Sequence, residues 1–171
     1  MVCLALLTAA FLSGQQVRVT PHTLANGMKI LIHEDHDVPN VALYFFYKVG
    51  SRNEQPGTTG ISHYFEHMMF NGAKKYGPKQ FDLVLESNGG YSNAYTNNDL
   101  TVYQDDFASE ALERVLDLES DRMRSLRITD VTLKSEREVV KEERRLRVDN
   151  DIMGTMDEEM GTLLFKAHPY R

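Results

Sequence analysis

The sequence predicts an α+β fold, in which a largely antiparallel sheet carries helices packed on one face. The expected elements are grouped along the chain: strands come first, then a pair of helices, a hairpin and several further helices. This grouping is typical of α+β domains, whereas a regular alternation of strands and helices would indicate a parallel sheet. Two hairpin signals, each between neighbouring strand segments, agree with antiparallel pairing. At 171 residues the chain fits one domain with a buried core.

The first segment, residues 1–14, has the pattern of a secretory signal peptide. Residues 2–12 form a short apolar run, and Ser13-Gly14 ends it in the manner of a cleavage site. No Lys or Arg precedes the run, which a start site placed too far downstream would explain; a buried N-terminal strand is the alternative. The run is too short to cross a bilayer, so we expect no stable membrane insertion. We expect an exported protein, secreted or in a bacterial periplasm, whose folded part covers residues 15–171.

The expected strands begin directly after this segment. Residues 17–24 and 28–33 flank an Asn-Gly pair, which is the strongest short hairpin signal when it lies between apolar runs. Residues 41–49 are almost continuously apolar and aromatic, which suits a strand buried on both faces. Residues 51–59 contain turn-forming residues and are expected to be a loop that leads into the first helix.

The remaining elements follow from turn and capping signals. Pro78 is well placed as the first residue of a helix, and a Gly-Gly pair ends that helix. Thr129 is a suitable N-cap for the longest helix, because a threonine side chain can accept a hydrogen bond from the first helical turn. The expected order is a helix from Pro78, strands at 91–96 and 100–106, and helices at 108–126, 129–149 and 157–166.

The charged residues of the helical half are interpreted mainly as solvent-exposed. The basic residues Arg144, Arg145 and Arg147 are interleaved with acidic ones, as on a solvated helix face. Glu119 and Asp121 could orient a ligand histidine through a hydrogen bond, but exposure is the preferred interpretation. The net charge of −6 argues against nucleic acid or an anionic membrane as a partner.

The segment with the strongest chemical signal contains His63, Glu66 and His67 in the order H-x-x-E-H. Successive residues of a helix turn by about 100°, so the two histidines lie one turn apart on the same side, with Glu66 beside them. A catalytic zinc site uses three protein ligands and keeps one position for water, from which Glu66 would take the proton. The alternative is that these residues form only the wet side of an amphipathic helix, although Phe70 on that side indicates that it is covered.

A third zinc ligand is expected from the helix at 129–149. Glu136 and Glu143 point within about 20° of one another and into its apolar stripe, whereas Glu142 points about 100° away. Buried carboxylates are costly unless a positive charge pairs with them, and zinc would supply that charge. The alternative is that both carboxylates reach out to solvent or pair with Arg137, Arg144 or Arg147. The complete two-histidine motif upstream favours the metal.

Four short motifs together carry a family resemblance. They are His63–Met68, Ser92–Thr96, Glu136–Glu143 and His168–Tyr170. In this combination the chain, from about Thr23 to its last residue, resembles the M16 metallopeptidases, which include pitrilysin, insulin-degrading enzyme and the mitochondrial processing peptidase. The resemblance implies the α+β fold of that family and a zinc-dependent activity.

The resemblance also implies a role for each matching residue of the site. His63, His67 and Glu143 would hold Zn²⁺, one ion per domain, and Glu66 would be the general base. Glu136 matches the second helical carboxylate of the family, which supports activity without being a direct ligand.

Asn93 and Ala94 match the edge strand with which family members pair the extended backbone of a substrate. The implied function is a zinc-dependent endopeptidase that hydrolyses extended peptides or unfolded polypeptides with zinc-activated water. In the family a second related domain closes over the substrate. We therefore expect residues 15–171 to be an N-terminal domain, truncated at its C-terminus, with a second M16-type domain on the same or another chain as its partner.

Two other functions remain open at this point. The chain could be a non-catalytic or incomplete subunit that acts as a binding or scaffold partner, although such subunits typically lack part of the motif that is complete here. It could also be an unrelated fold with an adventitious metal-binding helix, which predicts weak zinc affinity and no peptide cleavage.

Overall fold

The computed structural model describes residues 17–170, and the chain divides into two compact units at Val38 and Pro39. In the first unit, the antiparallel strands β1 (Thr20–Thr23) and β2 (Lys29–Ile32) form the predicted hairpin. Its turn contains Gly27 with a φ of 87°, a left-handed conformation that glycine adopts without steric cost. The expected signal peptide, residues 1–14, lies outside the described residues.

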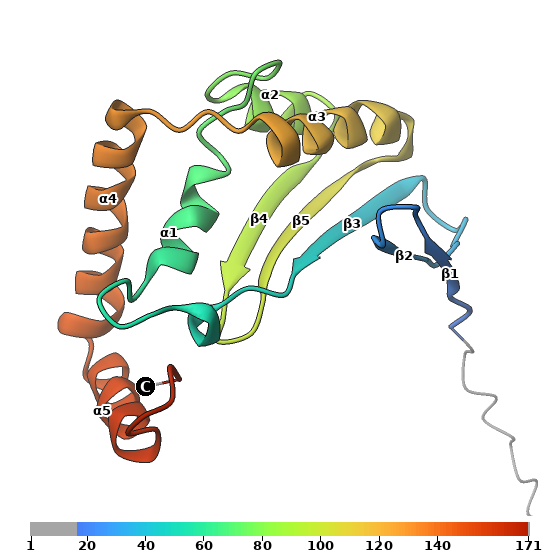
Figure 1. Ribbon diagram of the computed structural model, residues 1–171. Helices are drawn as coiled ribbons and strands as arrows, with labels where there is room; N and C mark the ends of the chain where they lie inside the picture. Colours follow the sequence, from blue (N-terminus) through green and yellow to red (C-terminus); the bar gives the residue numbers. More distant parts are fainter. Residues whose placement is uncertain (1–16, 171) are drawn as a thin grey trace, which may run out of the picture. The chain divides into compact units, whose positions relative to one another are not determined.

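The second unit is built on one antiparallel sheet of three strands (Figure 1). The strands are β3 (Asn40–Tyr47), β4 (Tyr91–Thr96) and β5 (Thr101–Ala108), and β5 lies in the middle. The short turn between β4 and β5 makes them the predicted hairpin, and Thr96 pairs with Thr101 next to that turn. The predicted fold class is confirmed, because helices accompany antiparallel sheets.

The helices of the second unit lie near the predicted positions. The helix predicted from Pro78 begins at Gln80, and the predicted N-cap Thr129 accepts a hydrogen bond from the backbone N–H of Thr132. The helices are α1 (Ile61–Met68), α2 (Gln80–Glu86), α3 (Leu112–Ser125), α4 (Asp130–Arg144) with a following π-helical turn (Arg145–Asp149), and α5 (Ile152–Leu164).

The core lies between one face of the sheet and helices α2 and α3. Phe107 of β5 is buried against Leu85 of α2 and Val115 of α3. On the other face, Tyr44 and Phe46 of β3 are exposed. The prediction that this strand is buried on both faces is therefore wrong for the described residues. Side chains of a strand alternate between faces, so helices that cover a single face bury only every second residue.

A buried ionic cluster lies beneath the covered face of the sheet. Arg122 of α3 forms an ion pair with Glu119, one turn earlier on the same helix, with 2.7 Å between Nη2 and Oε1. Both residues are buried, and so is Asp105 of β5. The guanidinium also lies over the rings of Phe81 and Tyr103, 4.3 and 4.6 Å from their centroids. The interpretation of Glu119 as an exposed residue is wrong.

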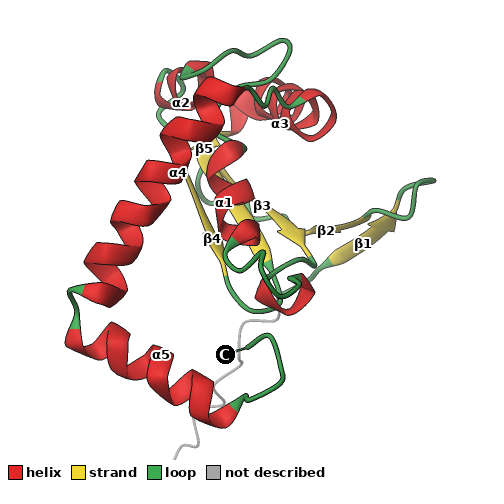
Figure 2. Ribbon diagram, turned by 60° about the vertical axis from the view of Figure 1, so that its left-hand side comes forward, coloured by secondary structure: helices red, strands yellow, loops and turns green. Residues whose placement is uncertain are grey.

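Helix α1 contacts both α4 and the strand β4. Figure 1 shows it between these two elements, and Figure 2 shows it overlapping the strands of the sheet. The side chains of one helix therefore face a second helix and a sheet edge at once. None of the helices described, from residue 17 to residue 170, is long and apolar enough to cross a membrane.

Candidate metal centre

Helix α1 is held at its first turn by a carboxylate from the preceding loop. The backbone N–H groups of Gly60 and Ser62 each donate to Glu54, with N to O distances of 2.8 Å. The first N–H groups of a helix have no partner within it, and negative charge is favoured there by the helix dipole. Sequence reasoning missed this contact; the only signal for it was an acidic residue shortly before the helix.

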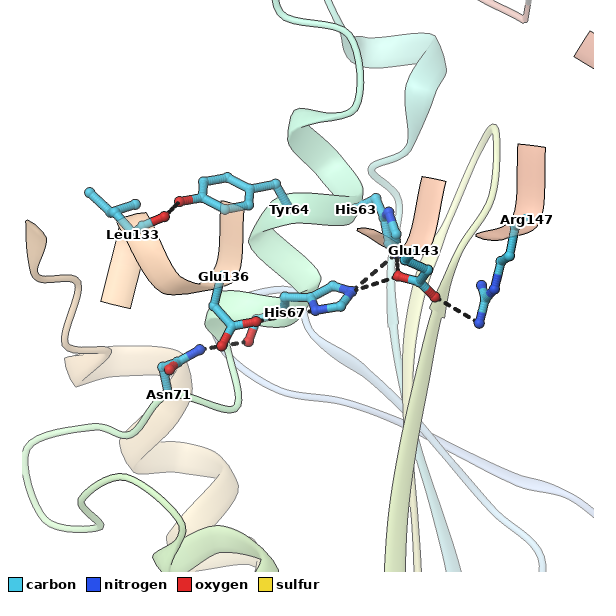
Figure 3. A network of polar contacts seen from close by, with 8 residues as sticks. All are labelled: His63, Tyr64, His67, Asn71, Leu133, Glu136, Glu143 and Arg147. Carbon is cyan, nitrogen blue, oxygen red and sulfur yellow. Dashed lines mark hydrogen bonds and ion pairs between the residues drawn. The ribbon is translucent and has the colours of Figure 1, made fainter. Parts of the chain in front are cut away.

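A hydrogen bond joins the middle of α1 to the first turn of α4. The Tyr64 hydroxyl donates to the backbone carbonyl of Leu133 over 2.5 Å (Figure 3). This contact connects residues that are far apart in the sequence. It brings one face of α4, with Glu136 and Glu143, against the face of α1 that carries the histidines.

Three side chains predicted as zinc ligands meet at one point (Figure 3). Glu143 Oε2 lies 3.3 Å from His63 Nε2 and 3.3 Å from His67 Nε2. The two Nε2 atoms are 3.2 Å apart. The three atoms therefore form a nearly equilateral triangle that combines residues from α1 and α4.

The chemistry of this triangle fits a bound cation. Glu143 Oε2 is buried and has no hydrogen-bond donor among residues 17–170. Tetrahedral zinc, with bonds of about 2.0–2.2 Å, separates neighbouring ligand atoms by about 3.3–3.5 Å, close to the observed spacing. Two imidazoles and one carboxylate also form a donor set that catalytic zinc sites use.

Glu136 contacts His67 on the side of the ring that points away from the triangle. Its Oε2 lies 3.3 Å from Nδ1 of His67, the ring nitrogen opposite the one that faces Glu143. A carboxylate in this position favours the tautomer with the proton on Nδ1, which leaves the lone pair of Nε2 free for a metal. This arrangement agrees with a supporting role for Glu136.

Arg147 contacts the second oxygen of Glu143. Its Nη2 lies 2.7 Å from Oε1, so the carboxylate is held on one side by the guanidinium and faces the histidines with the other oxygen. This is one of the arginine pairs considered as the alternative to a metal, and it occupies only the oxygen that faces away from the histidines. The predicted solvated face is present in the structure, because Arg144, Arg145 and Arg147 are all exposed.

Glu66, the predicted general base, is buried and lines the same cavity as the triangle. The Thr96 hydroxyl donates to Glu66 Oε2 over 2.6 Å. Sequence reasoning did not find this contact, because it depends on how β4 lies against α1.

A cavity of about 650 Å³ opens beside the triangle. Its walls come from α1, α4 and β4, and they include the predicted substrate-binding residues Asn93 and Ala94. Within residues 17–170, β4 pairs with β5 alone, so its other edge carries no strand. The structure therefore places the predicted substrate strand beside the predicted metal ligands.

Comparison with known proteins identifies the family. A family model described as insulinase, peptidase family M16, matches residues 29–158, which is most of the chain. The chain belongs to peptidase family M16. The family resemblance inferred from the motifs is thereby confirmed.

Several M16 relatives are named as zinc proteases. Zinc protease PqqE of Helicobacter pylori is 35% identical over 149 residues, which cover 86% of this chain and 34% of that protein. The crystal structure of a protease from Helicobacter pylori has a TM-score of 0.80 and 34% identity, over 90% of this chain and 37% of that one. The first half of the periplasmic protease PqqL from Escherichia coli has a TM-score of 0.78 and 26% identity, over 89% and 35% of the two chains.

The chain spans about a third of the length of these relatives. Their names and the family match support a zinc peptidase at the level of the family, and the solved structures share the α+β fold.

Proposed function

We propose that this chain carries the zinc site of an endopeptidase that hydrolyses extended peptides or unfolded polypeptides. The convergence of His63, His67 and Glu143 on one point is the observation that carries the proposal. Two histidines of one short helix could share a side by chance. A carboxylate from a distant helix, whose Oε2 is buried without a hydrogen-bond donor among the described residues, adds independent support.

His63, His67 and Glu143 would hold one zinc ion in this domain. Bound zinc would acidify water and polarise the carbonyl of the scissile peptide bond. Glu66 would accept the proton of the attacking water and pass it to the leaving amine. Glu136 would hold the ring of His67 in its tautomer.

The substrate would bind as an added strand along the edge of β4, with Asn93 and Ala94 among its contacts. An extended peptide can pair with an unpaired strand edge through backbone hydrogen bonds, which depend little on side chains. Because β4 lines the same cavity as the zinc triangle, a peptide paired there would pass the proposed ligands. Specificity for sequence would consequently be broad.

The whole protein would contain more than these 171 residues. The relatives are about three times as long as the aligned region, and one solved structure is the first half of its protease. We propose that a second M16-type domain, on the same or another chain, closes over the substrate. The protein would be exported, since residues 1–14 have the pattern of a signal peptide and the similar PqqL is periplasmic.

The proposed reaction is tested by Glu66→Gln in the full-length gene product. We expect zinc stoichiometry to be unchanged and cleavage of an unfolded polypeptide to fall by a factor of about 10²–10⁴, the usual contribution of a general base. Elemental analysis measures zinc, and a fluorogenic peptide measures cleavage. Glu138→Gln is a matched control, because Glu138 is exposed and pairs with Lys141.

Two outcomes would contradict the proposal. Equal cleavage by Glu66→Gln and the unsubstituted protein would exclude Glu66 as the base. A zinc-loaded full-length protein that cleaves no unfolded polypeptide would instead favour the non-catalytic scaffold.

A further inference from the structure

The proposed base is held by a residue that belongs to the proposed substrate strand. Glu66 is 7% exposed, and the Thr96 hydroxyl is the one side chain of residues 17–170 that donates to its carboxylate. The distance of 2.6 Å between Thr96 Oγ1 and Glu66 Oε2 is in the range of hydrogen bonds from a hydroxyl to an ionised carboxylate. Such bonds are about twice as strong as neutral ones.

The direction of this bond follows from counting hydroxyl protons. Thr96 Oγ1 also lies 3.2 Å from Thr101 Oγ1, and the Thr101 hydroxyl lies 3.0 Å from the backbone carbonyl of Val49. The two threonines have one hydroxyl proton each. The carboxylate cannot donate when it is ionised, so the Thr96 proton points to Glu66. The Thr101 proton then goes to Val49 or to Thr96.

The position of Thr96 is fixed by the backbone around it. Thr96 and Thr101 form the last pair of the β4–β5 ladder. The next residue, Asn97, accepts a hydrogen bond from the backbone N–H of Ser51 through its carbonyl oxygen. A Cβ at Gly50 would lie 2.3 Å from that same oxygen, so only glycine permits this approach. The hydroxyl of Thr96 is therefore presented to Glu66 by a tightly packed turn.

We propose that Thr96 is a positioning residue for Glu66. Its hydroxyl fixes Oε2 and so restricts the rotation of the carboxylate, which leaves the other oxygen to accept the proton of the attacking water. Ala94, expected to contact the substrate backbone, lies on the same strand. One strand would thus align both the peptide and the base. This inference rests on the proposed function, because it assigns Glu66 the role of base.

A purely structural role for Thr96 is the competing explanation. Leaving a buried carboxylate without a hydrogen-bond donor costs about 1–3 kcal/mol of stability. On this explanation, the hydroxyl of Thr96 stabilises the fold and does nothing else. The two roles differ in what they change. A structural role alters the melting temperature and the amount of folded protein, whereas a positioning role alters kcat in protein that is fully folded and zinc-loaded.

The test uses Thr96→Val and Thr96→Ser in the full-length gene product. Valine keeps the shape of threonine without the hydroxyl, and serine keeps the hydroxyl. We expect Thr96→Val to lower kcat about 10-fold or more, part of the 10²–10⁴ attributed to a general base, with KM changed less than about 3-fold and full zinc content. We expect Thr96→Ser to restore kcat to within about 3-fold of the original value.

Thr101→Val is the matched control on the partner strand. It also removes a buried hydroxyl of this network, but the direct bond from Thr96 to Glu66 can still form. We expect it to lower the melting temperature and to lower kcat by a smaller factor than Thr96→Val does. Crystal structures of the zinc-loaded variants supply a readout that is independent of activity: the Glu66 carboxylate should be displaced in Thr96→Val and retained in Thr101→Val.

The outcomes separate this inference from the proposed function. Full kcat in Thr96→Val beside an inactive Glu66→Gln would overturn the positioning role and leave the reaction standing. Equal losses in Thr96→Val and Thr96→Ser would also overturn it, because the hydroxyl would not be the cause. Full activity of Glu66→Gln would overturn the proposed function itself.

Discussion

The molecule contains two clusters of ionisable side chains that differ in their access to solvent. The open cluster consists of His63, His67 and Glu143, whose side chains are 33%, 21% and 21% exposed and line a cavity. The closed cluster consists of Asp105, Glu119 and Arg122, which are 0%, 1% and 2% exposed. Both combine side chains from separate elements, yet only the open cluster has access to a ligand.

The difference lies in how each cluster balances its charge. In the closed cluster, the guanidinium of Arg122 supplies the cation from within the fold. One guanidinium faces two carboxylates, and burial raises the pKa of Glu119 to about 8, so a proton supplies the remaining charge. Buried carboxylate oxygens without a hydrogen-bond partner occur in both clusters of the described residues. In the open cluster this oxygen is Glu143 Oε2, which faces two imidazole nitrogens beside the cavity. Acceptors that converge beside a cavity therefore indicate a cation from outside.

The largest effect is expected from Arg122→Met, which removes the internal cation of the closed cluster. Removing one partner of a buried ion pair costs about 3–5 kcal/mol, because the two carboxylates would keep a buried charge without its cation or would have to bind a second proton. The ring contacts of the guanidinium with Phe81 and Tyr103 would be lost as well. Urea denaturation of the zinc-free protein measures the change in the free energy of unfolding.

Arg124→Met is the control for this substitution. Arg124 lies on the same helix and is exposed, so its replacement should change the free energy of unfolding by less than about 0.5 kcal/mol. Similar stabilities of the two variants would show that the closed cluster does not depend on its cation.

The second prediction concerns the open cluster, where Glu143→Gln removes a proposed ligand charge. We expect zinc affinity to fall about 100-fold or more, which corresponds to about 2.7 kcal/mol, with little change in the stability of the zinc-free protein. Competition with a chromogenic chelator measures the affinity. Glu142→Gln is the matched control on α4, because Glu142 pairs with Arg145 at an exposed position. Equal effects of the two substitutions would remove Glu143 from the site.

The two clusters also differ in how far the sequence predicts them. His63, Glu66 and His67 lie on one helix, so their common side follows from helical geometry alone. The direction of Glu143 relative to Glu142 follows from the same geometry within α4. That α1 and α4 touch could not be predicted in this way, since it depends on tertiary contacts such as that of Tyr64 with Leu133; the family resemblance supplied it.

The errors of the sequence analysis have the same origin. Glu119 was expected at the surface because charged residues are rarely buried, but Arg122 and Asp105 complete a cluster that only the folded chain brings together. The apolar run that forms β3 was expected to be covered on both faces, and Phe46 shows that one face is open in the described residues. Composition indicates what a segment could bury, whereas the neighbouring elements decide what is covered.

The smallest effect is the change in stability per pH unit that we expect when the closed cluster is titrated. Arg122 and Asp105 face Glu119 at close range, and the hydroxyls of Tyr47 and Tyr103 lie nearby. Burial raises the pKa of both tyrosines above the ordinary value of 10.0, so both stay neutral while Glu119 titrates. Burial raises the pKa of Glu119 from 4.5 to about 8, so the folded state holds a proton that the unfolded state has already released.

The sign of the pH dependence follows from this difference. Stability due to Glu119 is complete below about pH 4.5 and is lost as the pH rises towards 8, because the folded state binds more protons over this interval. The free energy of unfolding should therefore fall by about 1 kcal/mol per pH unit between about pH 5.5 and 7.5. Glu119→Gln should make this slope shallower, while Glu138→Gln, at an exposed site, should keep it. Urea denaturation in the presence of a chelator measures the slopes. Equal slopes for the unsubstituted protein, Glu119→Gln and Glu138→Gln would show that Glu119 releases its proton near the ordinary pKa of 4.5. The closed cluster would then need no positive charge beyond that of Arg122.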